Sequence, residues 1–466
     1  MAARAVWPAG AALVASVAWS CGLGFEVDQA EFCRKRPSDP SCPAPAGAAG
    51  ASGLGGGGGA SGVGGSGASA GLGGGGSGGV GGLACEGSKV DCGGACVDLK
   101  ANDAANCGAC GRSCLGTATC ASGACVPEAL AEGEVAPYAL ADDGSHLYWV
   151  SPAVKSEVGF IPRMRRVAKA SAGGAVENAF ASTIVRARSL AFADGKLFWG
   201  DLGTNPTDTN QRLASGLVGS ADATTVEAAQ LNVQHVAVAG GKVYWSLTGE
   251  AAVRGKNADG TGTVSPNVAS QANVGWLAVD EEARPYWLGG VPREVRRLKA
   301  ASASEHEKVA DSPGGVAVEV FGGRVYWAEG TAVRSAPEAT PTTVAQEVEG
   351  LGRVEGFAVV AAAGAGGAAG QGGAGGAAGA GDPVLYVLTA EGRQLRAWRR
   401  GAADEAPLLL GEVTAKAEAY AGNPFGAAYV LADESYVYFA DVGTVDTTKL
   451  VPEATLQDGV VYRVAR

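Results

Sequence analysis

Val243-Tyr244-Trp245 is one copy of a short phrase, an apolar residue followed by two aromatic ones, that recurs along the C-terminal part of the chain. The other clear copies are Leu147-Tyr148-Trp149, Leu197-Phe198-Trp199, Pro285-Tyr286-Trp287 and Val325-Tyr326-Trp327. Two weaker copies follow, Leu385-Tyr386-Val387 and Val437-Tyr438-Phe439. Successive copies are roughly 40 to 60 residues apart, which is the period of propeller blades. The repeat therefore predicts a β-propeller with one blade for each copy.

The residues around each copy predict a blade of four short antiparallel strands. A small apolar strand precedes the phrase, as in Val236-Ala237-Val238, Leu277-Ala278-Val279 and Val316-Ala317-Val318. A turn such as Gly240-Gly241 separates the two strands. A third strand carries an apolar residue followed by arginine, and a more polar fourth strand closes the unit. We therefore predict an all-β fold with a seven-bladed propeller over residues 126–466, with six or eight blades as alternatives.

The two ends of the repeat array predict that the ring closes. The last unit stops after its third strand, Val461-Tyr462-Arg463-Val464, and lacks a fourth. Pro127 to Ala131 resembles a fourth strand without the first three. Together the two fragments complete one blade and leave no unpaired sheet edge at the seam. A Gly/Ala-rich tract at residues 361–381 interrupts the sixth unit and is expected to be a surface insertion.

Length and charge limit the function classes. The chain has 466 residues, a formal net charge of −11 and a sequence pI of about 5.0. Its length suits two or three domains. The acidic balance argues against a nucleic-acid partner, because nucleic-acid binding usually requires a basic face.

The N-terminus resembles an export signal, with Arg4 as the positive charge and a short apolar run that ends in small residues. We expect residues 1–20 to be a signal peptide, residues 21–43 to begin the mature chain and the Gly/Ala/Ser-rich residues 44–83 to be a disordered linker. Cys21 follows Ala18-Trp19-Ser20, which resembles the bacterial lipobox, so Cys21 would be the lipid anchor. Ordinary signal-peptidase cleavage is the alternative. We expect an outer-membrane or cell-surface lipoprotein, with secretion or a periplasmic location as the alternatives.

Cysteine usage points to the same oxidising environment. The chain has 11 cysteines, and an even number is left once Cys21 is set aside as the anchor. Residues 84–125 form a cysteine-dense module that is too small for a sufficient hydrophobic core without cross-links. Zinc is the rival interpretation, because Cys107 and Cys110 have zinc-knuckle spacing, but no histidine is nearby. We predict disulfides among Cys33, Cys42, Cys85, Cys92, Cys96, Cys107, Cys110, Cys114, Cys120 and Cys125.

Two resemblances to known families accompany these patterns. The aromatic copies resemble the YWTD-type and NHL-type repeats of extracellular propellers, found in lipoprotein-receptor ectodomains and related bacterial proteins. Asp201 and Asp441 stand where the YWTD family has its Asp, and the other copies lack it. The missing acids put in doubt the inter-blade hydrogen bonds that the resemblance implies. Residues 85–125 resemble a cysteine-rich module of myxobacterial surface proteins, which implies a location and no activity.

A search for chemistry finds few candidates. His146, His235 and His306 belong to different units, and we expect His146 and His235 at turns or strand edges. No His, Glu or Lys recurs at one blade position, which argues against a catalytic centre at the axis. Turn carboxylates such as Asp142, Asp280 and Asp433 are expected to be solvated, with calcium binding as the alternative. The aromatic pairs are expected to be core, with a ligand cage as the alternative.

Arginines recur on the third strand and could line one rim that meets an acidic partner: Arg165, Arg254, Arg296, Arg334 and Arg396. The favoured function is a non-enzymatic binding or scaffold protein of the cell envelope, whose partner is a protein or a polysaccharide. We expect a monomer without cofactor or metal, attached to the membrane only through its lipid. A propeller enzyme, either a lyase or a quinone-dependent sugar dehydrogenase, is the alternative.

Overall fold

The computed structural model describes residues 84–153, 163–170, 172–180, 185–203, 210–268, 270–301, 304–341, 343–362, 383–390, 394–400, 407–413, 425–449 and 452–466. The predictions for the signal peptide, Cys21, Cys33, Cys42, the linker and most of the 361–381 insertion lie outside these residues. Glu26–Val126 and Pro127–Arg466 belong to two separate compact units, and each is treated by itself. The described residues contain no helix, and hence none that could cross a membrane.

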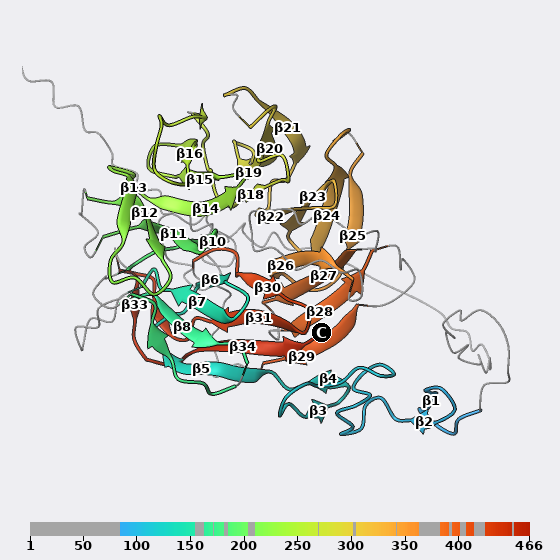
Figure 1. Ribbon diagram of the computed structural model, residues 1–466. Helices are drawn as coiled ribbons and strands as arrows, with labels where there is room; N and C mark the ends of the chain where they lie inside the picture. The colour runs from blue at the N-terminus through green and yellow to red at the C-terminus, as the bar shows by residue number, and fades with distance from the viewer. Residues whose placement is uncertain are drawn as a thin grey trace, which may run out of the picture. The chain divides into compact units, whose positions relative to one another are not determined.

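The described residues of the range 127–466 form seven four-stranded antiparallel sheets, and the first strands of these sheets surround a common axis (Figure 1). Blade 1 has β6 (Ala139–Asp142), β7 (His146–Val150), β8 (Arg165–Ala168) and β9 (Glu177–Asn178). Blade 2 has β10 (Leu190–Ala193), β11 (Lys196–Asp201), β12 (Arg212–Leu217) and β13 (Thr224–Glu227). Blade 3 has β14 (Val233–Ala239), β15 (Lys242–Leu247), β16 (Ala252–Asn257) and β17 (Asn267–Val268).

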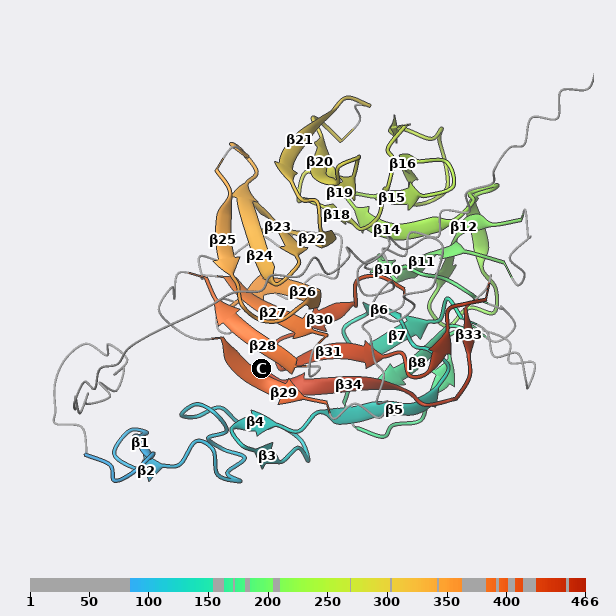
Figure 2. The same cartoon turned by 180° about the vertical axis from the view of Figure 1, so that it is seen from behind.

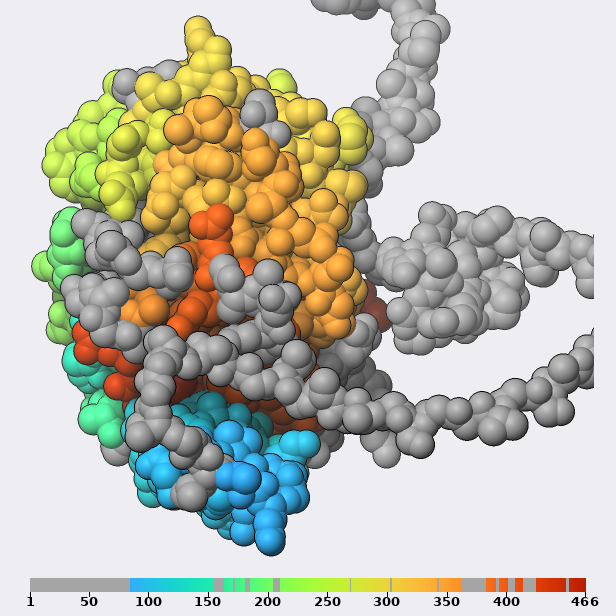
Figure 3. Space-filling view, turned by 90° about the vertical axis from the view of Figure 1, so that its right-hand side faces the viewer, coloured from blue at the N-terminus to red at the C-terminus, as the bar shows by residue number. Residues whose placement is uncertain are grey.

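The next three blades repeat this order. Blade 4 has β18 (Leu277–Val279), β19 (Pro285–Gly289), β20 (Glu294–Leu298) and β21 (His306–Asp311). Blade 5 has β22 (Gly315–Phe321), β23 (Arg324–Glu329), β24 (Ala332–Pro337) and β25 (Ala345–Val348). Blade 6 has β26 (Val354–Ala361), β27 (Pro383–Thr389), β28 (Gln394–Arg399) and β29 (Leu408–Glu412). Blades 5 and 6 form a closely packed flank in orange (Figure 3).

Blade 7 confirms the predicted closure, because its strands come from both ends of the unit. It contains β30 (Val430–Ala432), β31 (Tyr436–Asp441), β34 (Gly459–Ala465) and β5 (Glu128–Glu134), in that order. Strand β5 pairs antiparallel with β34, in a register that places Ala131 opposite Val461. Figure 2 shows the two strands side by side from behind. A small hairpin that the sequence did not predict, β32 (Val445–Asp446) with β33 (Glu453–Ala454), lies between β31 and β34 in the chain.

The aromatic phrase forms the core between blades. Successive residues of a strand point to opposite faces of its sheet, so each aromatic pair is shared between two neighbours. Tyr244 of blade 3 packs in one hydrophobic cluster with Trp287 of blade 4, and Tyr286 packs in another with Trp327 of blade 5. The five tryptophans of the phrase are at most 2% exposed. The prediction that the pairs are core is confirmed, and each buried ring contributes roughly 2–3 kcal/mol.

The described part of the cysteine-rich unit, residues 84–126, contains four disulfides, Cys85–Cys96, Cys92–Cys110, Cys107–Cys120 and Cys114–Cys125. The secondary structure of these residues is limited to two hairpins, β1 (Val90–Asp91) with β2 (Cys96–Val97) and β3 (Cys120–Ala121) with β4 (Ala124–Cys125). Short strands of this kind bury little apolar area, so the cross-links stabilise the unit chiefly by restricting the unfolded chain.

Candidate functional site

The axis of the propeller is lined by first strands whose residues occupy equivalent positions. The residue opposite the Tyr or Phe of the aromatic phrase is alanine in five blades: Ala141, Ala191, Ala237, Ala278 and Ala358. Blade 7 has Leu431 there, and blade 5 has Glu319. Small residues are expected where seven strands converge. Glu319 is therefore the one acid in a ring of small or apolar side chains.

A second set of large side chains stands two positions earlier on the same face of these strands. His235 of blade 3, Trp276 just before β18 and Tyr429 just before β30 occupy this position. The other four blades have Ala139, Ser189, Ala317 and Gly356. A side chain at Gly356 would meet the backbone of Ala428 in the next blade, which shows how closely the strands approach. Three of the seven blades therefore have a large side chain at a position that is small in the other four.

These exceptions meet in one axial pocket. His235, Trp276, Glu319 and Tyr429 all line a cavity of about 50 Å³, together with apolar residues of the first strands. Cavities for drug-sized ligands are about 300–1,000 Å³, so this one admits only a small group or a few water molecules.

Three aromatic rings from blades 3, 4 and 7 pack against one another across the axis. The centroid of His235 is 4.3 Å from that of Trp276 and 5.6 Å from that of Tyr429. Trp276 and Tyr429 are 4.7 Å apart, and the Tyr429 hydroxyl donates to the backbone carbonyl of Arg188 at 3.3 Å. Such pairs contribute about 0.5–1.5 kcal/mol each beyond area burial. The stack connects blade 7 with blades 3 and 4, which are distant from it in the sequence, and forms one wall of the pocket.

His235 is neutral and lacks hydrogen-bond partners. Its side chain is buried, and neither ring nitrogen has a hydrogen-bond partner of normal geometry among the described residues. Burial lowers its pKa to about 3, and the backbone of Leu277, which favours the charged ring, offsets this only in part. The expectation that His235 stands at a turn or strand edge is wrong. Sequence pattern could not show that β14 directs this position to the axis.

Glu319 is a carboxyl group without an ion-pair partner among the described residues. Enclosure raises its pKa to about 8, and the neighbouring indole of Trp276 offsets this only in part. The residue keeps some contact with water, which the pocket accounts for. Burying a lone carboxylate is costly, so the group stays protonated at neutral pH.

Glu319 predicts a pH dependence of stability. The folded-state pKa of about 8 is above the ordinary value of 4.5, so folding favours the protonated form. The stabilisation is complete below pH 4.5, falls as the pH rises towards 8, and is constant above that. We expect a loss of about 2 kcal/mol, less than the full displacement implies, because some water reaches the carboxyl.

Replacement of Glu319 by glutamine removes this titration and keeps the shape of the side chain. The variant should match the wild type at pH 4.5 and be more stable above pH 8. Urea unfolding at a series of pH values measures the difference in unfolding free energy between the two proteins. The contributions of the other titrating groups are the same in both and cancel in this difference. Parallel pH profiles for the two proteins would contradict the assigned burial of the carboxyl.

Glu319 was missed in the sequence because the residues just before it match the first-strand pattern of the other blades. Val316-Ala317-Val318 matches the apolar-Ala pattern of the other first strands, but β22 pairs two residues further along and places Val318 opposite Trp327. A shift of two preserves the inward and outward faces of a strand. The alternation of apolar residues therefore cannot detect the shift, but the distance to the glycine turn can: Glu319 stands three residues before Gly322, as Ala237 stands three residues before Gly240.

The five recurring arginines lie at equivalent positions on third strands, each opposite the Trp or Val of the aromatic phrase. Each has a local acceptor: Glu134 for Arg165 at 3.4 Å, Glu250 for Arg254 at 2.5 Å, Glu294 for Arg296 at 2.7 Å, Glu329 for Arg334 at 3.6 Å and Gln394 for Arg396 at 2.6 Å. Partner binding at this ring of arginines stays a prediction.

Inter-blade hydrogen bonds exist although the YWTD acids are missing from most copies. The indole N–H of Trp149 donates to Glu134 at 3.1 Å, and that of Trp245 donates to Gln230 at 2.8 Å. Each acceptor follows or ends the fourth strand of the preceding blade. Asp201 and Asp441 instead accept from the amides of Gly203 and Gly443 in their own turns. A different residue therefore provides the connection between blades.

Other predicted residues are separated. His146 begins the second strand of blade 1, and His306 begins the outermost strand of blade 4, so neither joins His235. Lys169 binds Asp142 at 2.6 Å and Asp433 at 2.7 Å. Asp280 is buried and pairs with Arg284 at 2.6 Å. The expectation of solvated turn carboxylates is wrong for these acids, because cations from neighbouring segments meet them.

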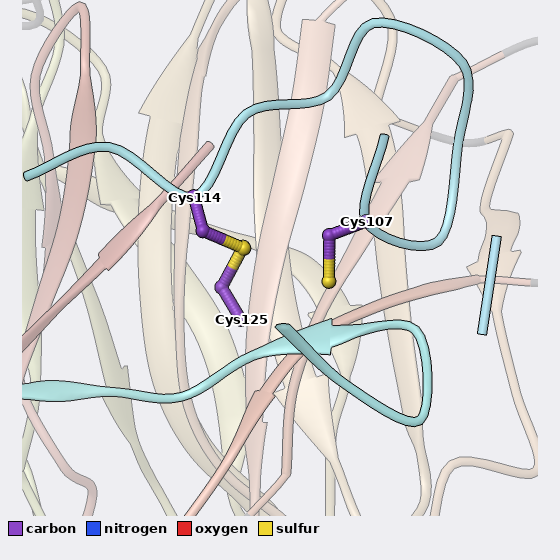
Figure 4. A group of neighbouring side chains, drawn as sticks. All are labelled: Cys107, Cys114 and Cys125. Atoms are coloured by element: carbon purple, nitrogen blue, oxygen red, sulfur yellow. A yellow bond between two sulfur atoms is a disulfide. The ribbon is translucent and has the colours of Figure 1, made fainter. Parts of the chain in front are cut away.

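The sulfur atoms of Cys107, Cys114 and Cys125 lie close enough together for a metal site, as Figure 4 shows. They belong to two adjacent disulfides. Zinc requires deprotonated thiols, and cysteines in disulfides cannot supply them. Disulfides account for the cluster.

No model of a known protein family matches the chain, and a comparison with curated proteins gives no match. Solved structures with similar folds include a streptogramin B lyase, with 9% identity and a TM-score of 0.48 over 73% of this chain and 97% of that chain. A chain of a nidogen/laminin complex has 14% identity and a TM-score of 0.39 over 57% and 97%. A PQQ-bound aldose sugar dehydrogenase from Streptomyces coelicolor has 16% and 0.37 over 58% and 95%. These neighbours include enzymes and a protein of an assembly.

Proposed function

We propose that this protein is a non-enzymatic binding protein of the cell envelope, whose axial pocket receives one group of a protein or polysaccharide partner. One observation carries the proposal: the side chains that break the blade repeat, His235, Trp276, Glu319 and Tyr429, all line the same pocket. Large aromatic residues and a lone acid are costly to place where blades converge. Ligand recognition explains why they stand there.

The pocket's chemistry favours binding over turnover. Acid–base catalysis generally uses two groups whose pKa values differ and are matched to their tasks. Burial lowers the pKa of His235 and raises that of Tyr429 well above its ordinary value, so both stay neutral from pH 5 to 9. Among the described residues of the lining, Glu319 is then the single group that titrates in this range. Neutral aromatic rings and one carboxyl group can hold a ligand, but they do not provide the acid–base pair that catalysis would use.

The envelope location is supported by the four disulfides, which persist in oxidising compartments. Attachment through Cys21 belongs to the proposal. Replacing Cys21 with serine should move the protein from the membrane fraction to the soluble fraction. Unchanged membrane association would assign the attachment to another feature.

The binding function is tested with the purified full-length protein and two ligand pools, the polysaccharide and protein fractions of an envelope extract. Trp276→Ala should reduce retention of the bound partner at least tenfold, because it removes a ring from the pocket wall. Trp276→Phe, which keeps a ring, is the matched control and should retain most binding. Equal retention by all three proteins would refute the pocket as the binding site.

The chemical state of the ligand separates binding from catalysis. Mass spectrometry of the partner before and after incubation should show no change in covalent structure. A cleaved or oxidised partner would favour the lyase or dehydrogenase alternative instead.

A further inference from the structure

We infer that the axial pocket binds a protonated alkylamine, the end of a lysine side chain of a partner protein, with Glu319 as its counter-ion. This inference rests on the proposed function, because it takes the pocket as the binding site. It adds the chemical class of the bound group and selects a protein over a polysaccharide.

The charge of the pocket calls for a cation. Glu319 is the only acid in the lining, and no lysine or arginine lines the cavity or pairs with this carboxyl among the described residues. Five of the six equivalent positions in the other blades are alanine. A lone carboxylate costs free energy in such surroundings, and an ammonium group that enters the pocket removes that cost.

The other walls fit the same ligand. The rings of Trp276 and Tyr429 line the cavity, and aromatic faces attract cations and also accept the methylene groups next to them. The ring of His235 is neutral, so it brings no competing positive charge to the wall. An ammonium with N–H groups can donate to the Glu319 carboxylate, whereas a quaternary ammonium cannot.

The size of the pocket selects the source of the amine. A cavity of about 50 Å³ takes an ammonium group with its first methylene groups, but it does not take a sugar ring. Lysine presents its ammonium on a flexible four-carbon stem, which can enter between the first strands while the rest of the partner stays outside. An amino sugar carries its ammonium directly on the ring, so the ammonium cannot enter the pocket without the ring.

Binding should depend on pH through Glu319 alone. The other titratable groups of the lining are His235 on β14 and Tyr429 before β30, and both stay neutral near pH 7. Arg188 and Tyr138 are outside the lining but adjoin Tyr429, through the Arg188 carbonyl and the edge of the Tyr138 ring, and each affects the pKa of the other. The ligand prefers the ionised carboxyl, whose pKa is about 8. Apparent affinity should therefore rise about tenfold per pH unit between pH 6 and 7.5 and level off above pH 8.

The test uses the full-length protein and n-butylammonium chloride as the probe, followed by calorimetry and by tryptophan fluorescence at pH 8.5. We expect saturable binding with a Kd on the order of 1 mM, as suits so small a ligand. Glu319→Gln should weaken binding at least tenfold. Glu132→Gln makes the same change of charge at an exposed position of β5 and should leave binding unchanged. Thermal melting confirms that both variants are folded.

Three further probes define the class. Potassium chloride should not compete, and tetramethylammonium should bind at least fivefold more weakly because it has no N–H group. Glucosammonium should bind weakly because of its ring. Equal binding of potassium would overturn the amine, and tighter binding of glucosammonium would overturn the lysine in favour of a polysaccharide.

The result also separates this inference from the proposed function. If butylammonium does not bind while Trp276→Ala still loses the envelope partner, the pocket is the binding site and the amine is wrong. If Trp276→Ala and Glu319→Gln both retain the partner, the pocket itself is wrong and both proposals fail.

Discussion

A chain that begins at Val135, and therefore lacks β5, will melt far below a chain that begins at Val126, or will not fold cooperatively. Strand β5 provides the outer strand of blade 7 through its pairing with β34. Its loss exposes the edge of β34 and removes Leu130, which is fully buried. The lost hydrogen bonds contribute about 1 kcal/mol each, and a buried leucine contributes about 2–3 kcal/mol.

The lost terms together are comparable with the 5–15 kcal/mol that stabilises typical domains. We therefore expect a decrease in Tm of at least about 10 °C, measured by calorimetry. A synthetic peptide of residues 126–136, added to the shorter chain, should restore most of the loss, since it can occupy the vacant edge. Equal melting temperatures without the peptide would show that β5 does not hold the ring closed.

The closed ring could be predicted because its evidence is periodic and local. The Tyr-Trp phrase marks the second strand of each blade, and the pair has a physical reason: the two rings face opposite neighbours. The incomplete blades at Pro127 and at Val461 to Val464 together make four strands, which predicts the observed antiparallel pairing of β5 with β34. Each of these inferences needs only the spacing of the aromatic copies along the chain and the alternation of side chains between the two faces of a strand.

The axial pocket could not be predicted, because its residues are joined only by the closure of the ring. His235 and Tyr429 stack although blades 3 and 7 are far apart in the sequence. No spacing rule connects them. Glu319 was hidden by a two-residue shift in register, which leaves the apolar pattern unchanged. Large or charged residues at otherwise small first-strand positions are the usable signal, provided that the first strands are aligned on their hairpin turns and not on their apolar residues.

Arg463→Met should destabilise the propeller by about 3–5 kcal/mol, or roughly 10 °C in Tm. Arg463 on β34 and Glu128 on β5 are both buried. The Nε atom of Arg463 donates to the Glu128 carboxylate at 2.8 Å. Another guanidinium nitrogen, Nη1, donates to the backbone carbonyl of Lys169 in blade 1 at 2.7 Å. The methionine fills a similar volume, so the expected loss comes from removing the guanidinium charge that faces the buried Glu128 carboxylate.

The double variant Arg463→Met/Glu128→Leu separates charge from packing. Replacing both members of a buried ion pair with apolar residues is often nearly neutral, so the double variant should regain most of the lost stability. The Lys169 carbonyl still loses its donor, and a deficit of about 1 kcal/mol should remain. Urea unfolding of the wild type, both single variants and the double variant gives the coupling energy between the two residues. Additive losses, with no recovery in the double variant, would mean that the ion pair does not couple β5 to β34.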